Sequence, residues 1–544
     1  MEAFMDTRDN ENYNLFIEKL DALWENYKYV LFYGAGAYGK CLQKYCLDNK
    51  KMIQAFLVSD SQNLEQRLWD EVPVMHLRDA RFKRDETCIV LTLSDKYHNG
   101  IIENLKKLGL NQVYSFSNDF FEALSTQNKL SLKMADYAIK DQDIDTYQIK
   151  ADKIINRYTS IRFCEFVTSR IGPMLELYIQ VTDSKYSDKN VLNVFIPIAL
   201  NREGNKEYFP NESIANKYCL EKMQTKLEIL TDKNIGFWKY VMENYRRKIS
   251  FSRRYDLHGL LMNQRIASRD YQINNEKRHM FFTEEEEDCG RKKLQKMNLN
   301  KEYVCFIARS SKYFEVVVGN AQESQCIQRN CSVENFQLMC DKLFQSNIQS
   351  VRMGYLVDGT IRGEGIIDYA NLYRDEFMDF YLVGKCKFVI CQLSGFHFIA
   401  TVFNKPAVIV NVHVLTIQGD IIDRCNPNQD LMIMKKIWGK KEKRFLTLRE
   451  ILLIEEKVKN IFRLAEFYEA GGYELIENTP EEIWDVTEEM MKRLNGTICY
   501  TEEEILIQKK FNRMLKKSVT VSDNLYWNVP MGTMFLKKNK WLLE

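Results

Sequence analysis

Arginine, aspartate and serine residues recur where predicted strands end in the C-terminal half of the chain, and together they could bind an anion. The positions are Arg309, Arg329, Asn330, Arg352, Gly354, Asp368, Asp379, Ser394 and Gly395. The planar guanidinium of arginine holds two oxygens of a phosphate or carboxylate at once. A Ser-Gly turn that opens a helix adds free backbone amides. Because the carboxyl ends of parallel strands meet at one edge of a sheet, we expect these residues to face a common ligand site.

Each of these positions also has an ordinary structural explanation. An arginine at a strand end commonly forms a salt bridge, and Ser394-Gly395, Asp368 and Asp379 could simply cap helices. His397, which follows the Ser-Gly turn, could approach a phosphate or could be a structural helix residue. The shared position at strand ends, rather than any single residue, favours the ligand site.

A glycine-rich turn near the start of the chain has the spacing of a nucleotide-binding loop. Gly34, Gly36 and Gly39 stand between the apolar run KYVLFY and a helical pattern. In such a loop the first glycine allows a tight turn, the second lets a phosphate approach the backbone, and the third lets helix and strand pack closely. Asp60 closes the next predicted strand, where a carboxylate can accept a hydrogen bond from a ribose hydroxyl. The alternative is a Rossmann-like module whose glycines serve packing alone.

Strands and helices alternate along most of the chain, which predicts an α/β protein with three Rossmann-like parallel sheets. The clearest strand signals lie at 28–33, 52–60, 88–93, 112–116, 190–199, 303–309, 348–354, 387–392 and 407–412. These signals divide the chain into a nucleotide-binding module (1–118), a helical connector (119–150), two further α/β domains (151–300 and 301–478) and C-terminal helices (479–544).

The composition argues against several classes of protein. The formal net charge is +2 over 544 residues, so nothing indicates binding to nucleic acid. No apolar run is long enough to span a bilayer, and the polar start lacks the pattern of a signal peptide, so we expect a cytoplasmic protein. The 14 cysteines are scattered through apolar runs, which is typical of core residues rather than of disulfides or a metal site.

Several segments of the chain occur in the same order in a known family. They are CFIARSSKYF, RNCSVENF, VRMGYLVDG, DEFMDFYLVGKCKFVICQLSGFHFIATVFNKPAVIVN and GGYELIENTPEEIWDVTEEMMKRL. Through them, residues 155–544 resemble bacterial glycosyltransferases found with O-antigen and capsule genes. The family's Arg-Ile-Gly element matches Arg170 and Gly172. Two positions differ, since Pro173 stands where the family usually has His and Ser310 where it usually has Asp.

The N-terminal segment carries a separate resemblance. VLFYGAGAYGKCLQKYC and the following IQAFLVSD, VPVMHLRD and IVLTLSD are similar to the nucleotide-sugar-binding domains of bacterial sugar acyltransferases. This resemblance implies that the N-terminal module could bind a nucleotide or nucleotide sugar.

The family resemblance implies a GT-B-like arrangement of the last two domains and a glycosyltransferase of polysaccharide biosynthesis. Its donor would be a nucleoside diphosphate sugar, and its acceptor a hydroxyl of a growing surface polysaccharide or of a lipid-linked glycan. The expected catalytic residues are Arg309, Arg329, Arg352 and Asp379. The expected substrate-binding residues are Arg170, Gly172, Asn330, Gly354, Asp368, Ser394 and Gly395. We expect no metal and no required cofactor, because Arg and helix N-termini neutralise the leaving diphosphate in such enzymes.

Two other motifs and two other functions stay open at this point. Asp143-Ile144-Asp145 is an Asp-x-Asp pattern, which holds a divalent cation in metal-dependent glycosyltransferases, but it lies in the polar connector. The basic run 435–444 could touch an anionic membrane surface or form a solvated loop. The alternative functions are a pyruvyl- or phospho-group transferase of cell-wall polymers and a non-catalytic nucleotide-sugar-binding scaffold.

Overall fold

A computed structural model describes most of the chain. The described residues are 10–60, 68–69, 71–182, 190–200, 206–210, 213–252, 277–313, 315–316, 327–415, 426, 428–458, 461–516 and 530–544. The chain divides into two compact units. Unit 1 comprises residues 1–166, 187–198 and 227–255, and unit 2 comprises residues 167–186, 199–226 and 256–544.

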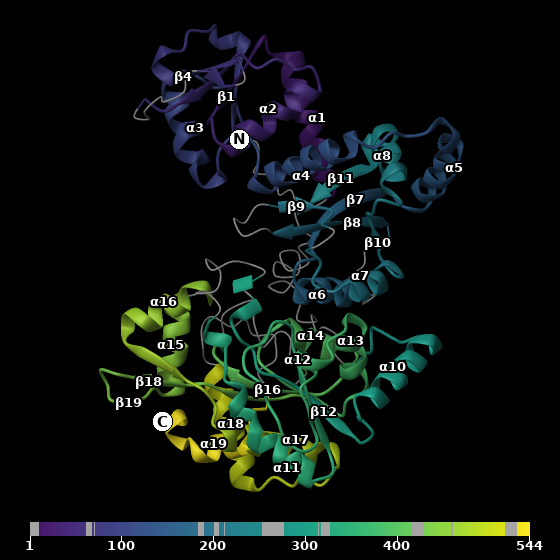
Figure 1. The fold of residues 1–544 in the computed structure, drawn as a ribbon. Helices are drawn as coiled ribbons and strands as arrows, with labels where there is room; N and C mark the ends of the chain where they lie inside the picture. Colours follow the sequence, from purple (N-terminus) through teal and green to yellow (C-terminus); the bar gives the residue numbers. More distant parts are fainter. Residues whose placement is uncertain are drawn as a thin grey trace. The chain divides into compact units, whose positions relative to one another are not determined.

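The first sheet of unit 1 carries the glycine-rich turn. Its strand order is β3 (Leu68–Trp69), β4 (Val72–His76), β2 (Ala55–Val58), β1 (Tyr29–Tyr33), β5 (Thr87–Leu91) and β6 (Val113–Ser115). All pairings are parallel except that of β3 with β4. The sheet is accompanied by α1 (Asn10–Asn26), α2 (Ala37–Asp48) and α3 (His98–Lys107) (Figure 1). Buried apolar side chains such as Leu31, Leu57 and Ile89 form its core.

A second sheet of unit 1 follows the order β10 (Glu228–Ile229), β8 (Val191–Leu200), β7 (Ser160–Val167) and β11 (Ile249–Ser252). β10 runs parallel to β8, and β11 parallel to β7. The helices beside it are α4 (Asn118–Ala135), α5 (Asp141–Arg157) and α8 (Ile235–Asn244). α4 packs against both α2 and β11, and it buries Phe120 and Leu124. The predicted connector, residues 119–150, is therefore helical, and its first helix, α4, packs into the interior of unit 1.

Unit 2 is built on a six-stranded parallel sheet. The strand order is β14 (Ile366–Ile367), β13 (Gln349–Met353), β12 (Tyr303–Ile307), β15 (Val389–Cys391), β16 (Ala407–Val412) and β17 (Leu431–Met434). One face is covered by α11 (Gln337–Gln345) and α17 (Pro480–Leu494), and the other by α13 (Glu376–Lys385) and α14 (Gly395–Val402) (Figure 1). Because helices cover both faces, the central strands are mostly apolar, and every residue of β16 is buried.

The remaining elements of unit 2 surround this sheet. The helices are α6 (Ile171–Thr182), α7 (Lys217–Gln224), α10 (Glu284–Lys296), α12 (Tyr369–Leu372), α15 (Leu448–Val458), α16 (Ile461–Gly471), α18 (Glu502–Lys516) and α19 (Thr533–Lys538). β19 (Arg444–Phe445), β18 (Lys436–Gly439) and β20 (Tyr473–Ile476) form a small antiparallel sheet. The basic run 435–444 thus contains a hairpin, where the sequence suggested a loop or a membrane contact.

The α/β class predicted from the sequence is confirmed, since parallel pairing occurs in all three larger sheets. The GT-B-like arrangement and the five-part division of the chain stay predictions. In the part of the chain that the structure describes, no helix is long and apolar enough to cross a membrane.

Candidate functional site

Polar side chains follow four adjacent strands at the carboxyl edge of the unit 2 sheet. Arg309, Gln392, His413 and Lys435 come after β12, β15, β16 and β17, respectively. The Arg309 backbone amide donates to Gln392 Oε1 at 2.9 Å, which ties the first two strand ends together. Parallel topology places all four positions at the edge where α/β proteins bind ligands.

Asn330 links two cations of this group. The Arg309 guanidinium donates to the Asn330 side-chain oxygen, and Lys435 Nζ donates to the Asn330 backbone carbonyl at 2.8 Å. Burial lowers the pKa of Lys435, while the carboxylate of Glu477 raises it. Two cationic side chains are therefore held close together before any ligand arrives.

His413 lies among these cations. Its side chain is 4% exposed, and neither ring nitrogen has a hydrogen-bond partner among the described residues. Burial lowers the pKa of His413 well below its usual range, and the charges of Arg329, Lys435 and Arg309 lower it further, in that order. The imidazole is thus neutral at pH 7, with one N–H to donate and one nitrogen to accept.

Two more buried polar atoms beside this group also lack a partner among the described residues. They are Gln392 Nε2 and Ser310 Oγ. A buried polar group without a hydrogen bond is costly, by about 1–3 kcal/mol, and such groups commonly mark places where a ligand or water binds. We call Arg309, Arg329, Gln392, His413 and Lys435 the carboxyl-edge cluster, and its chemistry suits a multiply charged anion.

The Ser394-Gly395 turn lies next to this edge, but Gly395 serves helix packing. Ser394 Oγ accepts from the Phe396 backbone amide at 3.3 Å and so caps α14. A Cβ on Gly395 would lie 2.4 Å from Ile171 Cγ2 and 2.8 Å from the Gly172 nitrogen. Gly172 and Gly395 therefore let the N-termini of α6 and α14 touch, and a larger side chain at position 395 would collide with α6.

Arg352 and Asp368 were expected at the ligand site, but the structure places both in buried structural contacts. The Arg352 side chain is fully buried and donates to the carbonyls of Gly359, at 2.9 Å, and Asp358. It also donates to Asp368 Oδ2 at 3.4 Å, and Asn371 Nδ2 donates to the same oxygen at 2.9 Å. The buried Arg352–Asp368 pair thus stabilises the segment between β13 and β14, and neither side chain faces the carboxyl-edge cluster.

Gly354 has a local backbone role. Its φ is +139°, and a Cβ there would lie 2.5 Å from Val357. This glycine therefore makes the turn after β13 possible, and nothing in its surroundings requires a ligand.

Asp379 and Arg170 belong to a second group of residues in unit 2. Asp379 accepts from Tyr369 Oη at 2.9 Å, from Arg374 Nη2 at 3.1 Å and from Asn216 Nδ2 at 3.3 Å. Burial raises the pKa of Asp379 to about 6, although Arg374 opposes the shift. Arg170 precedes α6 and lies close enough to Tyr313 to lower the pKa of that phenol, which burial raises.

The glycine-rich turn of unit 1 has the predicted geometry. Gly34 has a φ of +115°, and a Cβ on Gly39 would lie 2.5 Å from the Gly34 carbonyl, so these two glycines serve the turn and the close packing. Gly36 stands at the N-cap of α2, with open space where its Cβ would be. Asp60 follows β2 and accepts from the Arg78 backbone amide at 3.1 Å. The backbone of Gly36 is thus accessible to a phosphate.

Other candidate positions do not form a site. Asp143 and Asp145 lie on α5, and no group of three His, Cys, Asp or Glu residues that could hold a metal occurs among the described residues. His397 is buried in α14, with its Nε2 3.8 Å from Asp430 Oδ2. The surroundings of Asp143, Asp145 and His397 therefore indicate structural roles.

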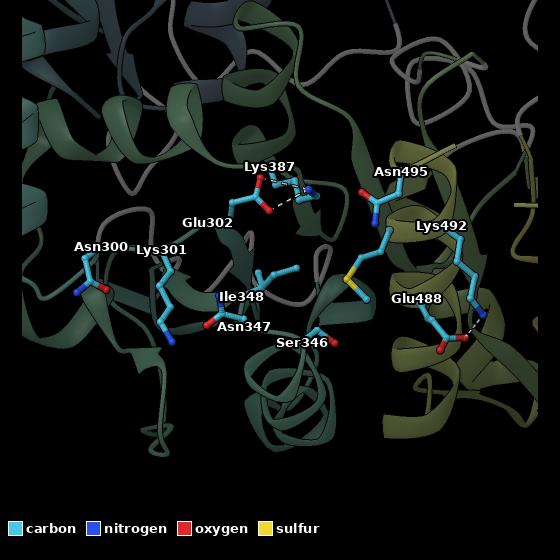
Figure 2. Close-up of a pocket in the computed structure, with 11 residues that line it drawn as sticks. Asn300, Lys301, Glu302, Ser346, Asn347, Ile348, Lys387, Glu488, Lys492 and Asn495 are labelled. Atoms are coloured by element: carbon cyan, nitrogen blue, oxygen red, sulfur yellow. Dashed lines mark hydrogen bonds and ion pairs between the residues drawn. The ribbon is translucent and has the colours of Figure 1, made fainter. Parts of the chain in front are cut away.

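A cavity of about 580 Å³ lies at the opposite, amino edge of the unit 2 sheet (Figure 2). Its lining includes Glu302, Ile348 and Lys387, which lie one or two residues before β12, β13 and β15. Lys387 pairs with Glu302 at 3.0 Å, and Lys492 pairs with Glu488 at 2.6 Å. Because these charges neutralise each other, the carboxyl edge is the stronger candidate for an anion site.

The comparisons with known proteins give distant structural likeness only. No protein-family model matches the chain, and no curated protein matches its sequence. A glycosyltransferase family 9 protein from Veillonella parvula is similar over 62% of this chain and 98% of its own, at 10% identity and a TM-score of 0.36. UDP-GlcNAc 2-epimerase from Methanocaldococcus jannaschii covers 85% of this chain and 99% of its own, at 7% identity and a TM-score of 0.20.

The E. coli heptosyltransferase WaaC, solved with ADP-2-deoxy-2-fluoro heptose, is also similar. It covers 74% of this chain and 92% of its own, at 7% identity and a TM-score of 0.17. TM-scores this low do not indicate a function. The function is therefore inferred from the residues of the site.

Sequence reasoning missed three members of the carboxyl-edge cluster, Gln392, His413 and Lys435. Each is the first or second polar residue after an apolar strand, and two of these strands were recognised from the sequence. Noting the residue after every strand, not only the arginines, would have found Gln392 and His413. β17 was not recognised, so Lys435 appeared to belong to a surface run.

Proposed function

We propose that this protein is a glycosyltransferase that moves a sugar from a nucleoside diphosphate sugar to a hydroxyl group. The proposal rests on Arg309, Arg329 and Lys435 gathered around His413, whose ring nitrogens have no described partner. Three cations, with Glu477 as the carboxylate that raises the pKa of Lys435, suit a diphosphate better than a neutral ligand. The acceptor proposed with it is a surface polysaccharide or a lipid-linked glycan, with peripheral contact to the membrane.

The cluster would act on the leaving group. Transfer breaks the bond between the anomeric carbon and a diphosphate oxygen and forms a bond from that carbon to the acceptor oxygen, whose proton passes to a base. Negative charge on the diphosphate grows toward the transition state, so preorganised cations stabilise that state most. Arg309 and Lys435 are already held by Asn330, and the N–H of neutral His413 can donate to a phosphate oxygen.

Unit 1 supplies a second proposed nucleotide site. The open approach to Gly36 at the N-terminus of α2 supports it, because backbone amides and the helix dipole favour a phosphate there. Asp60 also lies near the turn, since its charge raises the pKa of Tyr33, on which burial has the larger effect. This site would bind a nucleotide or nucleotide sugar.

Calorimetric titration of the full chain with UDP, GDP and ADP tests the diphosphate site, followed by turnover assays with the matching sugars. We expect Lys435→Ala and His413→Phe to weaken binding by about 10- to 100-fold, the effect of losing one charge-assisted hydrogen bond of about 1.5–3 kcal/mol. His413→Gln, which keeps a donor, should lose less.

Lys441→Ala is the matched control, because Lys441 is exposed in the β18–β19 hairpin. Unchanged affinity in both Lys435→Ala and His413→Phe would overturn the proposed site. Tight binding without turnover on any glycan acceptor would favour the non-catalytic scaffold instead.

A further inference from the structure

A group of aromatic and cationic side chains lies beside the carboxyl-edge cluster and has no part in the sugar transfer proposed for that cluster. Tyr313 Oη donates to the Ser169 carbonyl at 2.8 Å, which fixes Tyr313 next to Arg170. The Tyr355 ring lies 6.1 Å from that of Tyr313, and the Arg374 guanidinium stacks 4.0 Å from the Tyr355 centroid. We call Arg170, Lys312, Tyr313, Tyr355 and Arg374 the tyrosine–arginine group.

The charge of this group is positive. Arg170 and Arg374 both lower the pKa of Tyr313, so both cations lie within electrostatic range of its hydroxyl. Lys312 joins them, because its Nζ donates to the Val357 carbonyl at 3.4 Å. The group thus contains three cationic side chains, of which Arg374 is paired with Asp379, a buried carboxylate that also accepts from Tyr369 and Asn216. A second negative charge from a ligand would therefore be attracted here.

The group also offers an exposed aromatic ring beside a cation. Tyr355 is 45% exposed, so part of its ring is available for contact beyond the face that Arg374 covers. Arg374 Nε is buried with no partner among the described residues, so one donor of the guanidinium is unused. An exposed aromatic face with a cation at its side suits a sugar ring that carries an acidic group.

The position of the group connects it to the diphosphate site. Arg309 and Tyr313 lie on the same segment after β12, four residues apart, so their Cα atoms are at most about 14 Å apart. Gly172, two residues after Arg170, touches Gly395 at the N-terminus of α14. Both groups therefore lie along one edge of one sheet within unit 2.

We propose that the tyrosine–arginine group binds the carboxylate or phosphate of an acidic sugar next to the diphosphate. This inference rests on the proposed function and names its substrate class: the donor sugar or the acceptor sugar at this site is acidic. In both cases the ligand is a hexose-sized ring that carries an anionic group. The test distinguishes whether this ring belongs to the donor or to the acceptor.

The test compares ligands that differ only in charge, on the full chain. Binding of methyl β-glucuronide and methyl β-glucoside is measured by ligand-observed NMR for the acceptor, and binding of UDP-glucuronate and UDP-glucose by calorimetry for the donor. We expect at least one pair to show a preference of tenfold or more for the acidic member. The pair that shows it identifies the source, and the preference should shrink at high salt because charge attraction is screened.

Variants assign the preference to named residues. Arg170→Gln and Arg374→Gln should each reduce it at least threefold, and Arg374→Lys should retain part of it. Tyr355→Ala should weaken acidic and neutral members alike, whereas Tyr355→Phe should not. Arg362→Gln is the charge-matched control, because Arg362 is exposed on the same unit.

Two results would overturn the inference: no preference in either pair, or equal losses for acidic and neutral ligands in both arginine variants. The proposed function fails separately. Lys435→Ala should weaken nucleotide binding and leave the preference between methyl β-glucuronide and methyl β-glucoside unchanged. That preference in a protein that binds no nucleotide would reject the glycosyltransferase and leave the acidic-sugar site standing.

Discussion

Arg309 and Arg352 stand near the ends of adjacent parallel strands, yet their side chains have different surroundings. Arg309 reaches Asn330 and lies within the electrostatic range of His413. Arg352 is fully buried, and its described partners are two carbonyls and Asp368. An arginine whose terminal nitrogens donate to buried carbonyls and a carboxylate contributes to stability, whereas one held at a strand end beside other cations is placed to bind an anion.

At this scale we predict that Arg352→Ala acts on folding rather than on binding. Removing one partner of a buried ion pair leaves the other charge unpaired, so the free energy of unfolding should fall by about 3–5 kcal/mol. Denaturant unfolding measures the loss, and nucleotide titration of the folded variant should give an unchanged Kd. Normal stability combined with weakened nucleotide binding would show that Arg352 contributes to ligand binding rather than to stability.

The contact between α6 and α14 is decided by two glycines. Gly172 and Gly395 bring the N-termini of these helices together, and the space beside Gly395 is filled by Ile171 and by the α6 backbone. Since Arg170 directly precedes α6 and Ser394 caps α14, this contact also sets the position of both helix starts at the carboxyl edge.

At the scale of elements, we predict that Gly395→Ala lowers the free energy of unfolding by about 1–3 kcal/mol, the usual effect of overpacking. The added Cβ would meet backbone atoms of α6, which cannot rotate away. Gly100→Ala in α3 is the control, because its Cβ would enter open space. Equal stability of the two variants in denaturant unfolding would show that the helices are not in close contact.

The whole molecule consists of two compact units, and each has its own buried core. The carboxyl-edge cluster and the tyrosine–arginine group belong to unit 2, and the glycine-rich turn belongs to unit 1. Ligands for these sites should therefore stabilise different parts of the chain.

At this scale we predict two transitions in calorimetric unfolding. Leu57→Ala, in the core of unit 1, should lower one transition by about 5–10 °C, because a buried Leu→Ala change costs about 2–5 kcal/mol. A nucleoside diphosphate bound at the carboxyl edge should raise the other transition by mass action. If Lys435→Ala abolished a shift in the same transition that Leu57→Ala lowers, the assignment of the diphosphate site to unit 2 would be wrong.

Features that depend on neighbours along the chain were predictable from the amino-acid sequence. Apolar runs alternating with helical patterns predicted β1, β5, β12 and β16 within one or two residues. The spacing of Gly34, Gly36 and Gly39 predicted the turn geometry, because a tight turn and a close helix depend on the local backbone. The α/β class followed from the same local signals.

The three-dimensional fold was needed to show which polar residues lie together and which are buried. Lys435 donates to Asn330, 105 residues away, and no local pattern relates the two. Arg352 was predicted to bind ligand, and Gly395 to admit a phosphate, because each stands at a strand or helix end. Arg352 instead donates to Asp358, Gly359 and Asp368, which follow β13, and Gly395 is covered by the N-terminus of α6, which is distant in the chain. Burial depends on what packs from elsewhere in the chain, and for that reason the strand ends could be predicted from the sequence while the partners of their side chains could not.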